Sequence, residues 1–152
     1  MRVLIQRVKR GSVTISNEEY SRIGKGIVIL IGVKNGDTEE DAKYLAYRSA
    51  NLRIFEDEND KMNLSLLDIG GEALVVSQFT LYADTKKGHR PSYIEAAQPE
   101  LAMALYDSFC GYLFETVGKD KVKTGKFRAM MDVEIINDGP VTIAIESKRK
   151  GS

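Results

Sequence analysis

The segment 27–33 constrains the fold of this chain more strongly than any other. Its sequence, Ile-Val-Ile-Leu-Ile-Gly-Val, is a nearly continuous run of β-branched and aliphatic residues. A half-buried strand alternates apolar and polar side chains, whereas a strand that is buried on both faces is apolar throughout. The segment therefore predicts a strand in the interior of a sheet-rich fold.

Shorter patterns predict further strands on both sides of this segment. Residues 2–15 alternate apolar and polar side chains, with an irregularity expected near Gly11. The segment Asn137–Pro140 consists of ordinary turn residues, which on their own favour a hairpin between two strands. Besides 27–33, strands are expected at 2–15, in a short segment that ends at 24–26, and at 72–82, 121–124, 129–136 and 141–147.

Two helices are predicted from apolar residues at helical spacing. Residues 38–50 form the first, and Asp37 with Glu40 three residues later resembles a capping box at its start. Pro99 is suited to the first turn of a second helix, which is expected to end near Gly118. The whole pattern predicts an α+β fold, mixed and sheet-rich, with two or three helices.

The composition is that of an ordinary globular protein. Of the 152 residues, 43% are hydrophobic and 29% are charged, which argues against a disordered, collagen-like or disulfide-scaffold chain. This length fits one domain, expected over 1–147 and followed by a flexible basic tail at 148–152. The longest purely apolar run, 27–31, is too short to cross a membrane, and the first residues lack a signal-peptide pattern, so we expect a cytoplasmic protein.

The charges balance, with 22 basic and 22 acidic residues, so no net field attracts the chain to polyanions. Basic residues gather nevertheless in four local clusters, one of them around Arg7 and another at Lys86, Lys87 and Arg90. Solvated surface is the ordinary interpretation of such clusters. If they fold onto one side, they are expected to bind phosphates weakly and with strong salt dependence.

Conventional catalytic machinery is poorly represented. His89 is the only histidine, and it lies among Lys, Arg and Gly residues without a neighbouring carboxylate, so a Ser-His-Asp triad is not supported. Cys110 is the only cysteine, which excludes internal disulfides and cysteine-rich zinc sites. The acidic stretch Asp57–Asp60 lacks the glycine and terminal glutamate of an EF-hand loop and is interpreted as a turn. We therefore expect no metal site and no cofactor.

The segment Ser77–Thr80 is the strongest candidate site. It combines two hydroxyls, a carboxamide and an aromatic ring at the end of an apolar strand. In a continuing strand, Ser77 and Phe79 point to one face while Gln78 and Thr80 point to the other. Such a segment can present main-chain donors to a ligand, although hydroxyl residues are also common in strands without a functional role.

Two motifs together resemble the signature of the D-aminoacyl-tRNA deacylases: Ser77-Gln78-Phe79-Thr80-Leu81 and Asn137-Asp138-Gly139-Pro140-Val141-Thr142. The resemblance extends almost from end to end of the chain. It includes Met1-Arg2 and residues 5–8, 53–55, 61–63, 88–93 and 124–127. It implies a homodimer with a barrel-like sheet and helices against it, which acts in translational proofreading on the 3′ end of charged tRNA.

The reaction implied by this resemblance is hydrolysis of the ester between a D-amino acid and the terminal ribose of tRNA. Because this ester is already labile, the enzyme needs mainly to orient it, stabilise the oxyanion and admit water. Backbone N–H groups of Ser77, Gln78, Phe79 and Thr80, with the Gln78 side chain, are the implied catalytic groups. Thr80 remains an alternative nucleophile for which no base is visible, and a ribose hydroxyl of the substrate is an alternative source of assistance.

The resemblance also implies how D- and L-amino acids are distinguished. Gly139-Pro140 is implied to be a cis peptide whose carbonyls enter the partner subunit's pocket. If these carbonyls crowd one substituent position on the substrate's α-carbon, an L side chain is excluded, whereas glycyl esters carry hydrogen there and are accepted. Implied pocket residues are Phe127, Ala129 and Met131, with Arg128 where many relatives carry a small residue, and the expected weak tRNA contacts are Arg7, Lys86, Lys87 and Arg90.

Two functions from other classes stay open at this point. The first is an RNA-binding module that has kept the fold and lost catalysis. Incubation with a D-aminoacyl-tRNA distinguishes this module from a deacylase, because only the deacylase hydrolyses the ester. The second is a small serine or threonine esterase with a substrate other than RNA. Ready hydrolysis of a simple D-amino-acid ester without tRNA favours this esterase.

Overall fold

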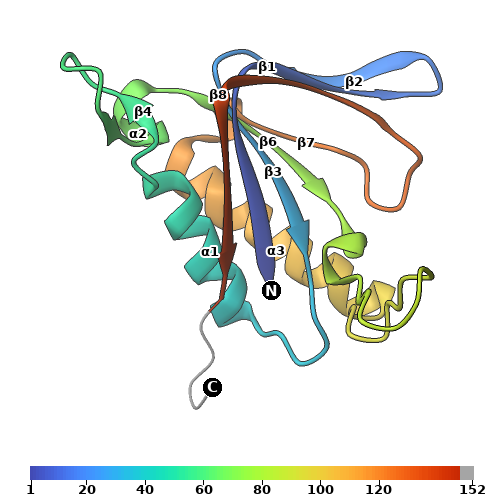
Figure 1. The fold of residues 1–152 in the computed structure, drawn as a ribbon. Helices are drawn as coiled ribbons and strands as arrows, with labels where there is room; N and C mark the ends of the chain where they lie inside the picture. Colours follow the sequence, from blue (N-terminus) through green and yellow to red (C-terminus); the bar gives the residue numbers. More distant parts are fainter. Residues whose placement is uncertain (148–152) are drawn as a thin grey trace.

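A mixed sheet of six strands organises residues 1–147, the part of the chain that the computed structural model describes (Figure 1). The basic tail expected at 148–152 lies outside the described residues. The strand order is β2-β1-β3-β6-β7. β3 and β2 pair with successive parts of one edge of β1, and β8 pairs with the opposite edge, so the sheet curls into a nearly closed barrel. The elements are β1 (Arg2–Ile15), β2 (Glu18–Ile23), β3 (Gly26–Gly32), α1 (Glu39–Asn51), β4 (Phe55–Glu56), β5 (Met62–Leu64), α2 (Leu66–Ile69), β6 (Glu72–Ser77), the 3-10 turn η1 (Phe79–Tyr82), α3 (Pro99–Val117), the 3-10 turn η2 (Lys119–Lys121), β7 (Val122–Thr124) and β8 (Asp132–Glu146).

Strand β3 lies in the interior of this sheet, as its apolar sequence predicts. It pairs antiparallel with β1 on one edge and parallel with β6 on the other. Of its residues, only Leu30 is more than marginally exposed. The sheet is therefore mixed, and the predicted sheet-rich α+β class is confirmed.

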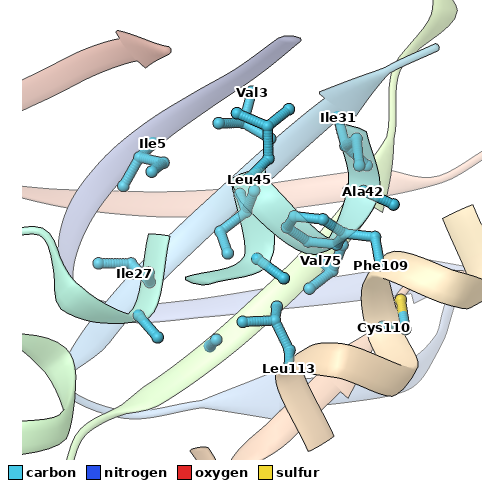
Figure 2. Packing of buried hydrophobic residues seen from close by; sticks show 14 of the residues in the cluster. Val3, Ile5, Ile27, Ile31, Ala42, Leu45, Val75, Phe109, Cys110 and Leu113 are labelled. Atoms are coloured by element: carbon cyan, nitrogen blue, oxygen red, sulfur yellow. The ribbon is translucent and has the colours of Figure 1, made fainter. Parts of the chain in front are cut away.

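Both faces of the sheet are covered by apolar side chains. On one face, Ile27 and Val75 pack against Leu45 of α1 and against Phe109 and Leu113 of α3 (Figure 2). On the other face, Val8, Val13, Ile23, Val28, Leu74 and Val76 form a second, smaller cluster. Successive residues of a strand point to opposite faces, so β3 and β6 contribute to both clusters.

The predicted hairpin at Asn137–Pro140 is wrong, because β8 runs through this segment as one strand. β8 pairs antiparallel with β1 along almost its whole length, as Figure 1 shows, and the pairing register shifts between Gln6 and Arg10. The turn residues therefore form a bulge in a long ladder and do not reverse the chain. The irregularity of β1 expected near Gly11 lies in this stretch and at Val13/Thr14.

Helices α1 and α3 start within one residue of their predicted positions, but the predicted cap of α1 is wrong. The N-cap is Thr38, whose backbone N–H donates to Asp41 Oδ2 at 2.8 Å. The Asp37 carboxylate is used elsewhere, since it lies 2.7 Å from the α-amine of Met1, with both groups fully buried. Within the described residues, no helix is long and apolar enough to cross a membrane.

Candidate active site

A cavity of about 630 Å³ lies where β6 ends. Ser77, Gln78 and Phe79 form one wall, and the start of α3 at Pro99 forms another. The segment 127–131, which leads into β8, closes a third side. The cavity therefore brings together three segments that are far apart in the sequence.

The chain turns sharply at this cavity, so the prediction of a strand over 72–82 is wrong beyond Ser77. The Gln78 N–H still donates to the Ile31 carbonyl at 2.8 Å, which continues the pairing of β6 with β3. The next four residues form η1. Because the first N–H groups of a helical turn have no acceptor within it, the amides of Phe79 and Thr80 are donors that the turn itself does not use.

The side chains of this segment do not alternate as a continuing strand requires. Ser77, Gln78 and Phe79 all line the cavity, and the Phe79 side chain is exposed. The Gln78 carboxamide donates a hydrogen bond to the Thr80 hydroxyl. Thr80 thus follows the lining residues and is linked to them through Gln78.

The three pocket residues implied by the resemblance, Phe127, Ala129 and Met131, all line the same cavity. The Phe127 ring lies 5.9 Å from the ring of Tyr106, centroid to centroid. Arg128 also lines the cavity and has a φ of 67°. This left-handed conformation favours a residue without a Cβ atom, so Arg128 occupies a position better suited to glycine.

The Gly139-Pro140 motif lies outside this cavity, exposed at the bulge of β8. Its peptide bond is cis. Two side chains hold the bulge: Arg7 Nε donates to the Asp138 carbonyl at 2.9 Å, and Asn137 Oδ1 accepts from the Val141 N–H at 2.8 Å. Within a single chain, the two signature motifs therefore do not share one pocket.

The expected tRNA contacts divide into two groups. Lys86, Lys87 and Arg90 are exposed in the loop between the Asp84 and Ser92 bridge residues. Arg7 is only 6% exposed, and its guanidinium donates to the carbonyls of Asp138 and Ile54. Arg7 is thus engaged by the chain's own backbone, whereas the loop residues face solvent.

Sequence reasoning missed the wall that the segment 93–102 adds to the cavity. Tyr93, Ala96, Ala97, Gln98 and Ala102 line it together with Val33. The Tyr93 ring lies 5.1 Å from the Phe79 ring in an edge-on arrangement. Tyr93, which belongs to the family-like stretch 88–93, was the sequence signal that could have indicated this wall.

The buried thiol of Cys110 and the buried phenol of Tyr106 are not suited to act as nucleophiles. Burial raises the pKa of the Cys110 thiol to about 12, so this thiol stays protonated near neutral pH. Burial also raises the pKa of Tyr106, whose hydroxyl donates to the Val75 carbonyl at 3.1 Å. Within residues 1–147, no three His, Cys, Asp or Glu side chains are grouped to hold a metal ion.

Comparison with solved structures supports this fold. A c-Myc DNA unwinding element binding protein superposes with a TM-score of 0.94 at 43% identity, covering 98% of this chain and 100% of that one. A probable eukaryotic D-amino acid tRNA deacylase has the same fold, with a TM-score of 0.83 at 21% identity over 95% of this chain and 98% of that one.

Comparison of sequences gives the family. The profile of the D-Tyr-tRNA(Tyr) deacylases matches residues 4–146. The D-aminoacyl-tRNA deacylase of Flavobacterium psychrophilum is 56% identical over 99% of both chains. That of Halalkalibacterium halodurans is 55% identical over 97% of this chain and 100% of its own. Since the match includes the segments that line the cavity, the resemblance drawn from the two motifs is confirmed: the chain belongs to the D-aminoacyl-tRNA deacylase family and is a hydrolase of that class.

Proposed function

We propose that the cavity at the end of β6 is the site where this hydrolase cleaves the ester of a D-aminoacyl-tRNA, releasing the free D-amino acid and tRNA. The observation that carries the proposal is the turn after Ser77. It places Gln78 and Phe79 in the cavity wall and leaves the first amides of η1 without an acceptor inside the turn. These are the donors that a developing oxyanion requires.

The chemistry proposed is attack by water on an oriented ester. The carbonyl carbon becomes tetrahedral, its oxygen gains negative charge, and the amides of Phe79 and Thr80 stabilise that charge. The leaving ribose oxygen then takes up the proton that the water gives up. The proposed reaction has no covalent enzyme intermediate. The Thr80 hydroxyl accepts a hydrogen bond from the Gln78 side-chain carboxamide, and no base lies next to Thr80 in the sequence to activate it.

Deacylation of matched D- and L-tyrosyl-tRNA tests this function directly. The protein is expected to release tyrosine from the D-substrate and to leave the L-substrate nearly intact. A simple D-tyrosine ester without tRNA is expected to react slowly, because it lacks the terminal ribose and phosphates. Equal hydrolysis of this small ester would favour the general esterase instead, and no hydrolysis of any substrate would favour the RNA-binding module.

Chiral selection is proposed to work by exclusion at Gly139-Pro140 of a second subunit. Their exposure on the bulge of β8 leaves both residues available to enter a neighbouring pocket. If their carbonyls occupy the space beside the substrate's α-carbon, only hydrogen fits in that position. D-amino acids and glycine then pass, and L-amino acids clash.

The smallest substrates give the sharpest test of exclusion. We expect the protein to cleave glycyl-tRNA and D-alanyl-tRNA, and to leave L-alanyl-tRNA nearly intact, because one methyl group at the crowded position is enough to clash. Single-turnover deacylation of the three substrates on the same tRNA measures this. Rejection of glycyl-tRNA as complete as that of L-alanyl-tRNA would show that the pocket requires a D side chain.

The homodimer is proposed to complete each site across the interface, and mixing two inactive variants tests it. Gln78→Ala changes the cavity wall, and Gly139→Val places a β-branched side chain where φ is 134° and Arg7 and Val141 leave little room. Random exchange makes half of the dimers mixed, each with one intact site, so about a quarter of wild-type activity should return. Monomeric sedimentation of a fully active protein would contradict the shared site.

Binding of tRNA is proposed to be modest and steeply salt-dependent, because only local basic clusters oppose the phosphates. Replacing both Lys86 and Lys87 with glutamate should weaken binding and flatten the slope of log affinity against log salt by about 0.7–0.9 for each phosphate that is no longer neutralised. The charge-matched control replaces Lys43 and Lys61 with glutamate; these two lysines are exposed on α1 and in the β4–β5 loop. Identical slopes for the two double variants would assign Lys86 and Lys87 to solvated surface.

A further inference from the structure

The turn η1 rests on β3 at a position where no side chain intervenes. A Cβ atom at Gly32 would lie 3.0 Å from Leu81 Cβ and 3.2 Å from the Gln78 carbonyl oxygen. Distances of this length are tighter than normal packing, so glycine allows the turn to sit directly on the strand. The location of η1 therefore depends on what holds it against Gly32.

Arg2 is the residue opposite Gly32 in the β1–β3 ladder, and its side chain reaches the turn. Its Nη1 donates to the Leu81 carbonyl at 2.7 Å, and its guanidinium carbon lies 4.4 Å from the centroid of the buried Tyr82 ring. Leu81 and Tyr82 are the last two residues of η1. The guanidinium thus contacts the turn on a polar and an aromatic group at once.

A third interaction orients this guanidinium. Arg2 Nη2 forms an ion pair with Glu146, its partner in the β1–β8 ladder. The side chains of Arg2 and Glu146 are 35% and 62% exposed, so the pair itself adds little to stability. Its consequence is geometric, because a planar guanidinium with one edge on Glu146 presents its other nitrogen to Leu81.

We infer that Arg2 is a positioning residue for deacylation, which holds η1 on the sheet so that Phe79 and the first amides of the turn face the cavity. The inference rests on the proposed function of this cavity. Arg2 itself does not line the cavity, so its replacement changes the placement of the donors and leaves the residues that line the cavity unchanged. Small misplacements of catalytic groups lower kcat strongly.

The test compares kcat and KM for D-tyrosyl-tRNA in four variants. Arg2→Ala should lower kcat about tenfold or more while KM changes less than about twofold, and Arg2→Lys, which keeps one donor for Leu81, should recover part of kcat. Arg2→Gln removes the fork but keeps much of the stem, and it replaces Arg2→Ala if that variant does not fold. The matched control is Arg10→Ala, which removes an exposed β1–β8 ion pair with Glu134 remote from η1.

Hydrogen exchange of the Leu81 and Ala83 amides, which donate to the Gln78 and Thr80 carbonyls, separates this inference from the proposed function. Exchange there should accelerate at least about tenfold in Arg2→Ala and stay unchanged in Arg10→Ala. If wild-type protein fails to cleave D-tyrosyl-tRNA, the proposed function falls while the exchange result still reports on η1. If wild type is active and Arg2→Ala matches Arg10→Ala in kcat, or if exchange of the Leu81 and Ala83 amides is the same in both, the inference is overturned.

Discussion

Phe79→Pro is expected to lower kcat for D-tyrosyl-tRNA by ~10²–10³ relative to Phe79→Ala, the loss typical for one oxyanion donor. Both variants lack the aromatic ring, but only proline lacks the backbone N–H. The local backbone accepts proline, because position 79 is the first residue of the turn and Gln78 before it is not helical, with a φ of −141° and a ψ of 86°. Single-turnover rates of the two variants therefore isolate the contribution of one amide.

Thr80→Val provides the complementary comparison, since it removes the hydroxyl and keeps the amide. If main-chain donors carry the reaction, this variant keeps a measurable share of the deacylation rate. An inactive but folded Thr80→Val protein, with an acyl-enzyme trapped on the wild type, would assign the reaction to a threonine nucleophile. Equal rates for Phe79→Pro and Phe79→Ala would remove the Phe79 amide from the proposed oxyanion site.

Gly26→Ala should cause a large loss of stability, about 3 kcal/mol or more. A Cβ atom at this position would lie 1.8 Å from the backbone carbonyl oxygen of Glu72. Backbone cannot rotate away as a side chain does, so β3 and β6 would have to separate at the point where their pairing begins. Urea unfolding followed by circular dichroism measures the change in the free energy of unfolding.

Gly111→Ala is the matched control, because its added methyl group meets no atom within 4 Å. Gly111 lies in the C-terminal half of α3, where alanine should stabilise the helix by about 0.5–1 kcal/mol. The two substitutions add the same atom and should shift stability in opposite directions. A Gly26→Ala protein as stable as the wild type would show that the strands part at little cost.

The sequence predicted those elements whose signals are local. The apolar run at 27–33 and the periodicities after Thr38 and Pro99 are properties of single segments, and β3, α1 and α3 follow them closely. The end of β6 was mispredicted because Phe79, Leu81 and Tyr82 are residues that occur readily in strands. The turn at this point contacts Gly32 and Arg2, which are distant in the sequence.

The candidate site shows the same division. Ser77–Phe79 and the pocket residues at 127–131 were expected together because the family resemblance links them. The wall at 93–102 depends on tertiary contacts, among them the hydrogen bond from the Ala97 N–H to the Val33 carbonyl at 2.9 Å. The cap of α1 was mispredicted for a similar reason, because Asp37 binds the distant α-amine of Met1.

The pairing of β1 with β8 determines when the fold can be completed. Arg2 pairs with Glu146 and Thr14 with Asp132, so the first strand waits for the last before its outer edge is covered. Contacts between such distant residues carry a high loop-closure entropy and are typical of slowly folding proteins. On a growing chain, the first strand stays unpaired along that edge until β8 has been made. During this time its unpaired N–H and C=O groups are a template for association with other chains.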